Sequence, residues 1–416
     1  MTPIASLRRF QSARIAEFRE SVIREMTRQA IQHGAVNLAQ GFPDFPAPAE
    51  LKEAAQKAIA DDFNQYPITW GIKPFREAIC QSYKRFYNID IDPEREVTVC
   101  CGATEGMIAT LLALLNQGDE VVVFEPFYEN YWPDSQLSGA IVKHVRLRPP
   151  DWSFDPDDLK AAFNSRTRAV IVNSPNNPTG KVFSRAELIA LGELCEEYDC
   201  LIVCDEIYEH IIFDGEKHIP PITLGALRER TVLINGLSKT FSVTGWRVGW
   251  VIAPPELTNS IRKVHDFLTV GAATPLQYAG ITALNLPDDY FTQLSTTYQQ
   301  KRDYLIAILE KNGFRCHIPK GAYYVMCDIS ELDFTNDVTC CRHLVENVGV
   351  SAVPGSSFFA DPAHGSHFVR FCFAKKLETL DAAAERLEAL NTDRTARERY
   401  QAFETPISVE PLKLNP

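Results

Sequence analysis

The sequence has no long apolar run, no zinc-binding spacing of cysteine and histidine, and no excess of basic residues. No stretch of the 416 residues approaches the roughly 20 apolar residues that a membrane-spanning helix needs. The 11 cysteines are scattered and form no CxxC motif, which disfavours a disulfide scaffold or a structural zinc site. We therefore expect reduced thiols, no bound metal and a cytoplasmic location. The net charge of -12 disfavours nucleic acid as a partner, because phosphate contacts need cations.

The composition and the hydrophobic pattern predict a globular α/β protein. Hydrophobic residues make up 45% of the chain and charged residues 23%, as in ordinary globular domains. Between about residues 50 and 285, short and nearly continuous apolar runs alternate with helical patterns. Such runs are typical of strands buried on both faces of a parallel sheet. The prediction is a mostly parallel central sheet flanked by helices, with a smaller α+β domain.

The pattern changes near residue 288, where one long helix is predicted over 288–312. We divide the chain into an N-terminal arm that joins the small domain (1–45), a large domain (46–287), a small C-terminal domain (288–391) and a polar tail (392–416). The arm is expected to be amphipathic, because acidic residues are interleaved among its arginines.

Polar residues follow four of the predicted strands, and ligands of open α/β sheets bind beyond the carboxyl ends of strands. Gly102-Ala103-Thr104 follows the strand at 97–101 and opens a helix, where free N–H groups favour a phosphate. A rigid turn that contains Asn177 follows the strand at 169–173. Taken singly, the first motif is an ordinary connection and the second a stiff loop.

The other two strand ends carry ionisable groups. Asp205 ends the strand at 201–205, and a carboxylate there needs a cationic partner if it is buried. Lys239 follows the strand at 231–235 and is flanked by small, hydroxyl and aromatic residues, which suits a desolvated amine for Schiff-base chemistry. A helix cap and a surface lysine are the ordinary explanations of each residue alone. The four turns together indicate one site.

The motifs NNPTG (176–180), DEIY (205–208) and SKTFSVTGWRVG (238–249) together resemble the pyridoxal-phosphate aminotransferases of fold type I, class I/II. The resemblance covers roughly residues 20–390. The segment QGFPDFP (40–46), supported by KGAYY (320–324), is similar to the branch of kynurenine, glutamine and methionine aminotransferases. The implied reaction is a ping-pong transfer of an amino group from an amino acid, of neutral or aromatic side chain, to a 2-oxo acid.

The resemblance implies a role for each motif residue toward pyridoxal 5'-phosphate. Lys239 would form the Schiff base and, once displaced by substrate, move a proton between Cα and the cofactor. Asp205 would pair with the ring nitrogen and keep it protonated. Asn177 and Tyr208 would hydrogen-bond the phenolic oxygen, and Tyr128 would stack on the ring. The phosphate would be held by Gly102, Ala103, Thr104, Ser238 and Arg247.

The substrate carboxylate and a second subunit complete the implied site. Arg370 lies inside an apolar strand pattern and would bind the α-carboxylate, with Gly41 and Asn177 beside it. Tyr66 resembles a tyrosine that reaches the phosphate of the neighbouring subunit. This implies a homodimer with shared active sites.

The sequence departs from its relatives at two places. Gly236 stands where many relatives have a hydroxyl residue for the phosphate, so Ser238 is the expected substitute. Thr104 and Glu105 stand where some aspartate-using relatives have a lysine, which disfavours an acidic substrate side chain unless another arginine binds it. Aromatic residues that either line an apolar substrate pocket or pack in the core are Phe42, Phe45, Trp70, Phe358 and Phe359.

Three alternatives to the neutral or aromatic aminotransferase remain at this point. A lyase that cleaves Cβ–S bonds would use the same cofactor on the same fold. An aspartate-type aminotransferase would differ only in its substrate pocket. A catalytically silent regulatory or scaffold protein is the alternative from another class, and the presence of both Lys239 and Asp205 argues against it.

Overall fold

The computed structural model describes residues 12–16, 18 and 20–392. Its centre is an eight-stranded sheet in the order β2-β9-β8-β7-β6-β3-β4-β5. The inner strands β4, β3, β6, β7 and β8 run parallel, whereas β9, β2 and β5 pair antiparallel with their neighbours. The strands are β2 (Val97–Cys100), β3 (Glu120–Glu125), β4 (Ile141–Arg148), β5 (Ser153–Phe154), β6 (Thr167–Asn173), β7 (Leu201–Asp205), β8 (Thr231–Gly236) and β9 (Gly249–Ile252).

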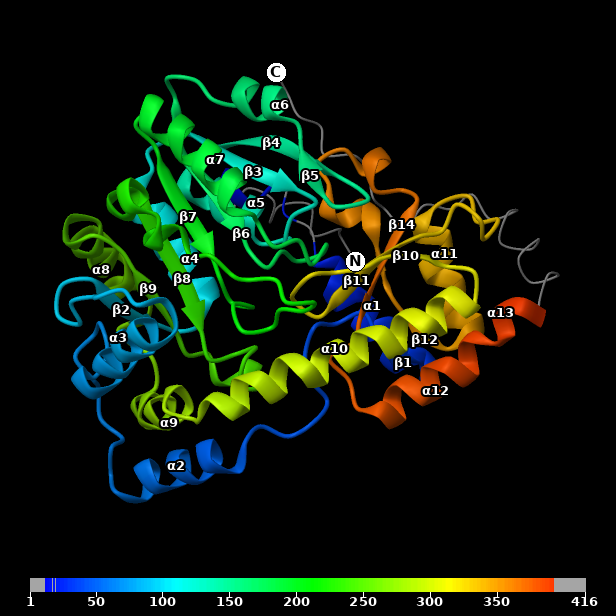
Figure 1. Ribbon diagram of the computed structural model, residues 1–416, viewed down its shortest axis with the longest axis horizontal. Coiled ribbons are helices and arrows are strands. Elements are labelled where there is room, and N and C mark those ends of the chain that lie inside the picture. The colour runs from blue at the N-terminus through cyan, green and yellow to red at the C-terminus, as the bar shows by residue number, and fades with distance from the viewer. Residues whose placement is uncertain (1–11, 17, 19, 393–416) are drawn as a thin grey trace, which may run out of the picture.

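Helices cover both faces of this sheet (Figure 1). Consecutive residues of β3 face opposite sides, so Val121 and Val123 pack in one core cluster with α4, while Val122 and Phe124 pack in another. Both faces are therefore buried, as the continuous apolar runs predicted. The helices that follow the arm are α2 (Ala49–Ala60), α3 (Lys73–Tyr87), α4 (Ala103–Leu114), α5 (Tyr131–Ser138), α6 (Pro156–Ala161), α7 (Arg185–Glu197), α8 (Pro255–Thr269) and α9 (Thr274–Leu284).

A smaller antiparallel sheet has the order β10-β11-β14-β13. The long helix α10 leads into it from the large sheet (Figure 1). The helices and strands of this C-terminal part of the chain are α10 (Asp288–Lys311), β10 (Arg315–His317), β11 (Tyr324–Asp328), α11 (Asp337–His343), β12 (Val350–Ser351), β13 (Val353–Pro354), β14 (Phe368–Cys372), α12 (Leu377–Leu387) and α13 (Ala389–Thr392). The arm contributes α1 (Val22–His33) and β1 (Val36–Asn37), and β1 pairs in parallel with β12.

The predicted fold class is confirmed, and most element ends differ from the prediction by one to three residues. The helix predicted over 288–312 is Asp288–Lys311, and Ser184 caps α7 in a capping box with Glu187. Helix α1 is amphipathic, with Ile23, Met26 and Ala30 buried. Residues 1–11 of the arm, and the tail at 392–416 apart from Thr392, lie outside the described residues. The division into domains stays a prediction.

Strand β9 was not predicted. It joins β8 through an irregular loop rather than a helix, and a connection without a crossover leads to antiparallel pairing. None of the eleven cysteines, which all lie in the described part of the chain, forms a disulfide. No helix in the described part of the chain combines the length and the apolar character needed to cross a membrane.

Candidate active site

A cavity of about 210 Å³ lies at the carboxyl ends of β6, β7 and β8. This is the edge of the sheet where the sequence motifs predicted a site. Ten of the predicted site residues line the cavity: Gly41, Ala103, Thr104, Tyr128, Asn177, Asp205, Tyr208, Ser238, Lys239 and Arg247. Gly102, Arg370 and Tyr66 do not line it. The first two contact residues that do, and Tyr66 is 85% exposed.

Lys239 projects its amine into this cavity from the loop after β8. Nζ lies 3.4 Å from the carbonyl oxygen of Gly41, its one hydrogen-bond partner within the described chain. Burial lowers the pKa of Lys239 to about 8, and the cationic Arg247 and Arg370 act in the same direction. An amine with such a pKa is half unprotonated near pH 8, far below the pH at which an exposed lysine loses its proton, and the unprotonated amine is the form that attacks an aldehyde.

Asp205 is fixed at the end of β7 by two donors. The hydroxyl of Tyr131 donates to Oδ2 at 2.8 Å, and the backbone N–H of Ile207 donates to Oδ1 at 3.3 Å. Burial raises the pKa of Asp205, while these hydrogen bonds and the charge of Lys239 oppose the rise. Tyr131 was missed by sequence reasoning, since nothing local connects it with a residue 74 positions away.

Arg370 on β14 is fully buried and has no acidic partner among the described residues. Nη1 donates to Oδ1 of Asn177 at 2.8 Å, and Nη2 donates to the carbonyl of Ala39 at 2.7 Å. Nε has no hydrogen-bond partner. The guanidinium also stacks over the ring of Tyr324, 4.2 Å from its centroid. A buried cation without a counter-charge is costly, and a ligand carboxylate would provide that charge.

The turn before α4 brings a cation to a helix start. Gly102 has a φ of +83°, and a Cβ there would lie 2.5 Å from Nη2 of Arg247. Arg247 donates from Nη2 to Oγ1 of Thr104 at 3.3 Å. The first turn of α4 and this guanidinium therefore lie together, an arrangement that favours an anion.

Gly236 cannot carry the hydroxyl side chain found in many relatives. A Cβ there would lie 2.8 Å from the carbonyl oxygen of Val248 and 2.9 Å from Cα of Gly249. The close pairing of β8 with β9 therefore requires glycine at this position. Ser238 lines the cavity instead.

Two tyrosines, one in the loop after β7 and one at the start of β11, meet at the wall of the cavity. The hydroxyls of Tyr208 and Tyr324 lie 3.2 Å apart, and a Cβ on Gly41 would lie 1.7 Å from the hydroxyl of Tyr324. In the sequence, Tyr324 stands out only as part of a motif that supports the family resemblance. Its position at the cavity was not predicted. Most other lining residues that sequence reasoning missed are polar, and three are apolar: Ser21, Arg24, Gln40, Glu129, Asn130, Asp134 and Asn173, with Ile23, Met107 and Ile207.

The five aromatic residues considered for an apolar pocket do not line the cavity. Phe42, Phe45 and Trp70 lie under cations, at 4.3 Å from Lys375, 3.9 Å from Lys301 and 4.8 Å from Arg262. Phe358 and Phe359 are buried in the main core cluster. Phe358 and Phe359 therefore pack in the core, whereas Phe42, Phe45 and Trp70 are half-buried beside cations.

Comparisons with known proteins agree with this arrangement. The family "Aminotransferase class I and II" matches residues 33–387. Methionine aminotransferase of Escherichia coli (strain K12) is 38% identical over 378 residues, which cover 91% of this chain and 98% of that protein. Kynurenine–oxoglutarate transaminase 1 of Homo sapiens is 36% identical over 396 residues, covering 87% of this chain and 94% of that protein.

Solved structures show the same likeness. N-succinyldiaminopimelate aminotransferase from Mycobacterium tuberculosis superimposes with a TM-score of 0.89 at 39% identity, covering 91% of this chain and 100% of that one. Aspartate aminotransferase from Thermus thermophilus, solved with maleate, gives a TM-score of 0.85 at 32% identity, covering 91% and 99%. The chain belongs to the class I and II aminotransferases. It is an enzyme that moves an amino group between an amino acid and a 2-oxo acid, and enzymes of this family depend on pyridoxal 5'-phosphate.

Proposed function

We propose that this enzyme binds pyridoxal 5'-phosphate in the cavity and transfers the amino group of a neutral or aromatic amino acid to a 2-oxo acid. The observation that carries the proposal is the set of groups around one cavity. It comprises an amine of lowered pKa, a buried carboxylate, an anion-binding helix start and a buried arginine without a counter-charge. The donor set fits the cofactor: Lys239 for the aldehyde, Asp205 for the ring nitrogen, and the Gly102-Ala103-Thr104 turn with Ser238 and Arg247 for the phosphate.

The chain's own residues would divide the work as follows. When bound, the cofactor supplies an electron-poor ring that accepts the electron pair left on the substrate Cα. Lys239 Nζ would take the proton from the substrate Cα and carry it within the site. Asp205, held by Tyr131, would keep a proton on the ring nitrogen. Tyr208 and Asn177 would hold the phenolic oxygen, and Tyr128 would pack against the ring.

Arg370 would orient the substrate by its carboxylate. The guanidinium is pinned by Ala39, Asn177 and Tyr324, so its free donors have one fixed direction. Both substrates of the two half-reactions carry an α-carboxylate, and one arginine therefore serves both. Gly41 leaves the space that Tyr324 occupies beside it.

The substrate side chain is tested by a donor screen. The purified protein with added pyridoxal 5'-phosphate is expected to absorb in the visible range, and the absorption should bleach when an amino acid is added without a 2-oxo acid. Methionine, kynurenine, phenylalanine, glutamine and aspartate are compared as donors, with 2-oxoglutarate, pyruvate and glyoxylate as acceptors. A higher kcat/KM for methionine, kynurenine or phenylalanine than for aspartate supports the proposal. A protein that never absorbs with the cofactor contradicts it.

One observation favours the aspartate-type alternative enough to keep it in the screen. Arg24 lines the cavity and makes no ion pair with a described residue, so it is available to a second carboxylate. Glu105, in contrast, is committed elsewhere, with His265 Nδ1 at 2.9 Å and the N–H of Cys101 at 3.0 Å. Release of pyruvate and ammonia from a β-thio amino acid without an acceptor would instead indicate the lyase.

We also propose that two copies share their active sites. The segments 59–70 and 267–274 lie together, since Thr274 donates to the carbonyl of Gln65 at 2.7 Å. They expose large apolar side chains to a degree unusual for a monomer surface, among them Tyr66 (85%) and Phe267 (91%). A second copy seated there would bury them and place Tyr66 at the phosphate of its neighbour.

A hybrid dimer tests this sharing. We expect Lys239→Ala protomers to be inactive and Tyr66→Ala protomers to bind the cofactor weakly. Refolding both together at equal amounts should restore about one quarter of the native activity at limiting cofactor, because half of the dimers are hybrids with one intact site. If Tyr66 serves its own protomer, or none, the mixture gains nothing over the separate variants. Sedimentation of the native protein as a monomer would also contradict the proposal.

A further inference from the structure

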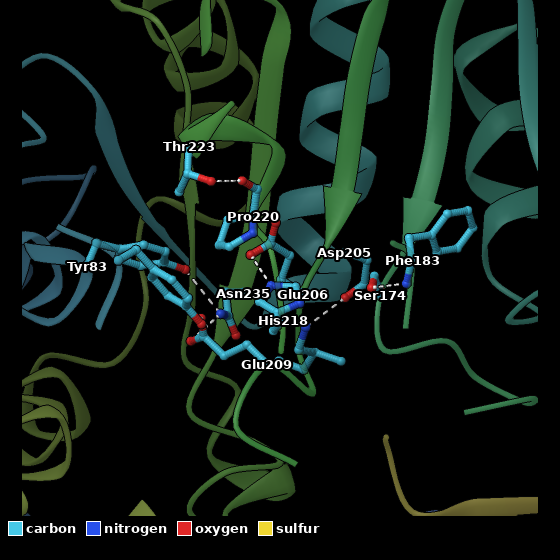
Figure 2. Close-up of polar contacts among 12 residues, drawn as sticks. Tyr83, Ser174, Phe183, Asp205, Glu206, Glu209, His218, Pro220, Thr223 and Asn235 are labelled. Carbon is cyan, nitrogen blue, oxygen red and sulfur yellow. Dashed lines mark hydrogen bonds and ion pairs between the residues drawn. The ribbon is translucent and has the colours of Figure 1, made fainter. Parts of the chain in front are cut away.

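A buried polar cluster lies next to Asp205 and follows it directly along the chain (Figure 2). Its acidic members, Glu206 and Glu209, are 1% and 7% exposed, and His218 is 8% exposed. None of these three lines the cavity. Burying two carboxylates and an imidazole costs free energy, which hydrogen bonds and ion pairs must offset. The partners of these hydrogen bonds indicate what the cluster connects.

Glu209 connects the loop after β7, which carries Tyr208, with the end of β8, which precedes Lys239. Its Oε1 accepts from Nδ2 of Asn235 at 2.7 Å, and its Oε2 accepts from the hydroxyl of Tyr87 at 2.8 Å (Figure 2 shows the bond to Asn235). Asn235 in turn accepts from the N–H of Gly236 at 2.7 Å through Oδ1. Glu209 directly follows Tyr208, and Asn235–Gly236 ends β8 just before the loop of Lys239.

The neighbouring bonds stiffen the same junction. The N–H of Glu206 donates to the carbonyl of Ile234 at 2.9 Å, and the N–H of Glu209 donates to the carbonyl of Glu206 at 2.9 Å. The carboxylate of Glu206 is held by Nε2 of His218 at 2.8 Å. The loop after β7 is thus tied to β8 through its backbone near Glu206 and through a side chain at Glu209.

The titratable groups that face Glu209 are Glu206, His218, His210, Tyr83 and Tyr87. Burial and the neighbouring Glu206 raise the pKa of Glu209 to about 7, against the opposing charge of His218. The pKa of His218 is raised by its contact with Glu206, although burial opposes this. His210 lies 3.5 Å from Glu209, but burial lowers its pKa to about 3 and leaves it neutral. The remaining facing groups are the hydroxyls of Tyr83 and Tyr87 and the amide of Asn235.

We propose that Glu209 is a positioning residue for transamination, which aligns the hydroxyl of Tyr208 with the amine of Lys239 by bonding to Asn235. The inference rests on the proposed function, because it assigns Tyr208 and Lys239 to the two sides of one bound cofactor. Its physical basis is the sensitivity of such sites to geometry, since a misplacement of about 1 Å costs about 100-fold in rate. Glu209 itself touches neither substrate nor cofactor.

The test compares two substitutions that differ only in the bonds they keep. Glu209→Gln retains an oxygen for Asn235 and an N–H for Tyr87, whereas Glu209→Leu retains neither. We expect the leucine variant to lose about 100-fold in kcat with KM changed less than threefold, and the glutamine variant to stay within about fivefold of native. The pH midpoint of the cofactor's visible absorption should shift in the leucine variant and not in the glutamine variant.

Glu120 offers a matched control. It is a fully buried acid at the amino end of β3, away from the site, and its carboxylate is bonded to Asn164 at 2.7 Å and to Arg166. Glu120→Leu should lower the melting temperature yet leave kcat and the absorption midpoint of the folded protein unchanged. If Glu209→Leu behaves like Glu120→Leu, the role of Glu209 is structural only and the proposal is wrong.

The single variant Asn235→Ala keeps the proposal testable if Glu209→Leu folds poorly, and a double-mutant cycle applies where both variants fold. Asn235→Ala removes the other end of the bond and should give the same loss of kcat, and the double variant should lose little more than either single one. Additive losses would overturn the proposal. Failure of the proposed function looks different, because the native protein would then neither absorb with the cofactor nor transaminate any donor.

Discussion

Replacing Lys239 by alanine is expected to lower kcat by about 10⁴-fold or more, because the variant loses both the nucleophile and the proton carrier. Borohydride treatment of the native protein with pyridoxal 5'-phosphate should leave a pyridoxyl group on the peptide that contains residue 239. Mass mapping of the variant should find none there. Lys181 is the control, since it is a buried lysine in an ion pair with Glu187 at 2.7 Å. Lys181→Ala should keep both the adduct and the native kcat.

The same amine makes the loading of the enzyme depend on pH. With the pKa of Lys239 lowered to about 8, the protonated form prevails below pH 8 and cannot attack the aldehyde. The rate at which cofactor-free protein takes up pyridoxal 5'-phosphate should therefore rise with pH and level off above about pH 8. A rise that continues toward pH 10 would show that burial does not lower the pKa of Lys239. An adduct on any other lysine would contradict the assignment of the site.

The fold was predictable where one local signal decides an element. Runs such as that of β3 are apolar at every inner position because both faces are buried, and the capping box of Ser184 fixes the start of α7 from two residues alone. Strand β9 was not predictable in this way. It has four residues, it follows an irregular loop, and one of its two partners, β2, comes from a distant part of the sequence.

The site was predictable to the extent that its residues end strands. Asp205, Asn177 and Lys239 follow buried runs, and parallel strands bring their carboxyl ends to one edge. Tyr131 and Glu209 act through other residues, across 74 and 26 positions, and no spacing rule connects them with Asp205 or Asn235. The role of Tyr66, which the resemblance implies, stays a prediction. Contacts between distant elements are thus what the sequence left open.

Replacing Arg370 by leucine is expected to lower kcat/KM by about 1,000-fold for amino acids and 2-oxo acids alike, which corresponds to about 4 kcal/mol of lost contact with the carboxylate. Most of the loss should fall on KM, since the carboxylate is bound equally before and during proton transfer. Arg370→Lys keeps the charge but not the paired donors, so an intermediate loss is expected. An amine substrate without a carboxylate should react equally slowly with the native and the variant enzyme.

Arg76 separates this effect from the loss of any buried arginine. It is 1% exposed and donates to the carbonyl of Gly71 at 3.1 Å, but it lies outside the cavity. Arg76→Leu should lower the melting temperature while the folded enzyme keeps its native KM. Equal losses for Arg76→Leu and Arg370→Leu, or an unchanged KM in the latter, would show that Arg370 only supports Asn177 and Tyr324. These outcomes follow from one fact: the cation of Arg370 is buried among carbonyl oxygens and aromatic rings, and no carboxylate of the described residues forms an ion pair with it.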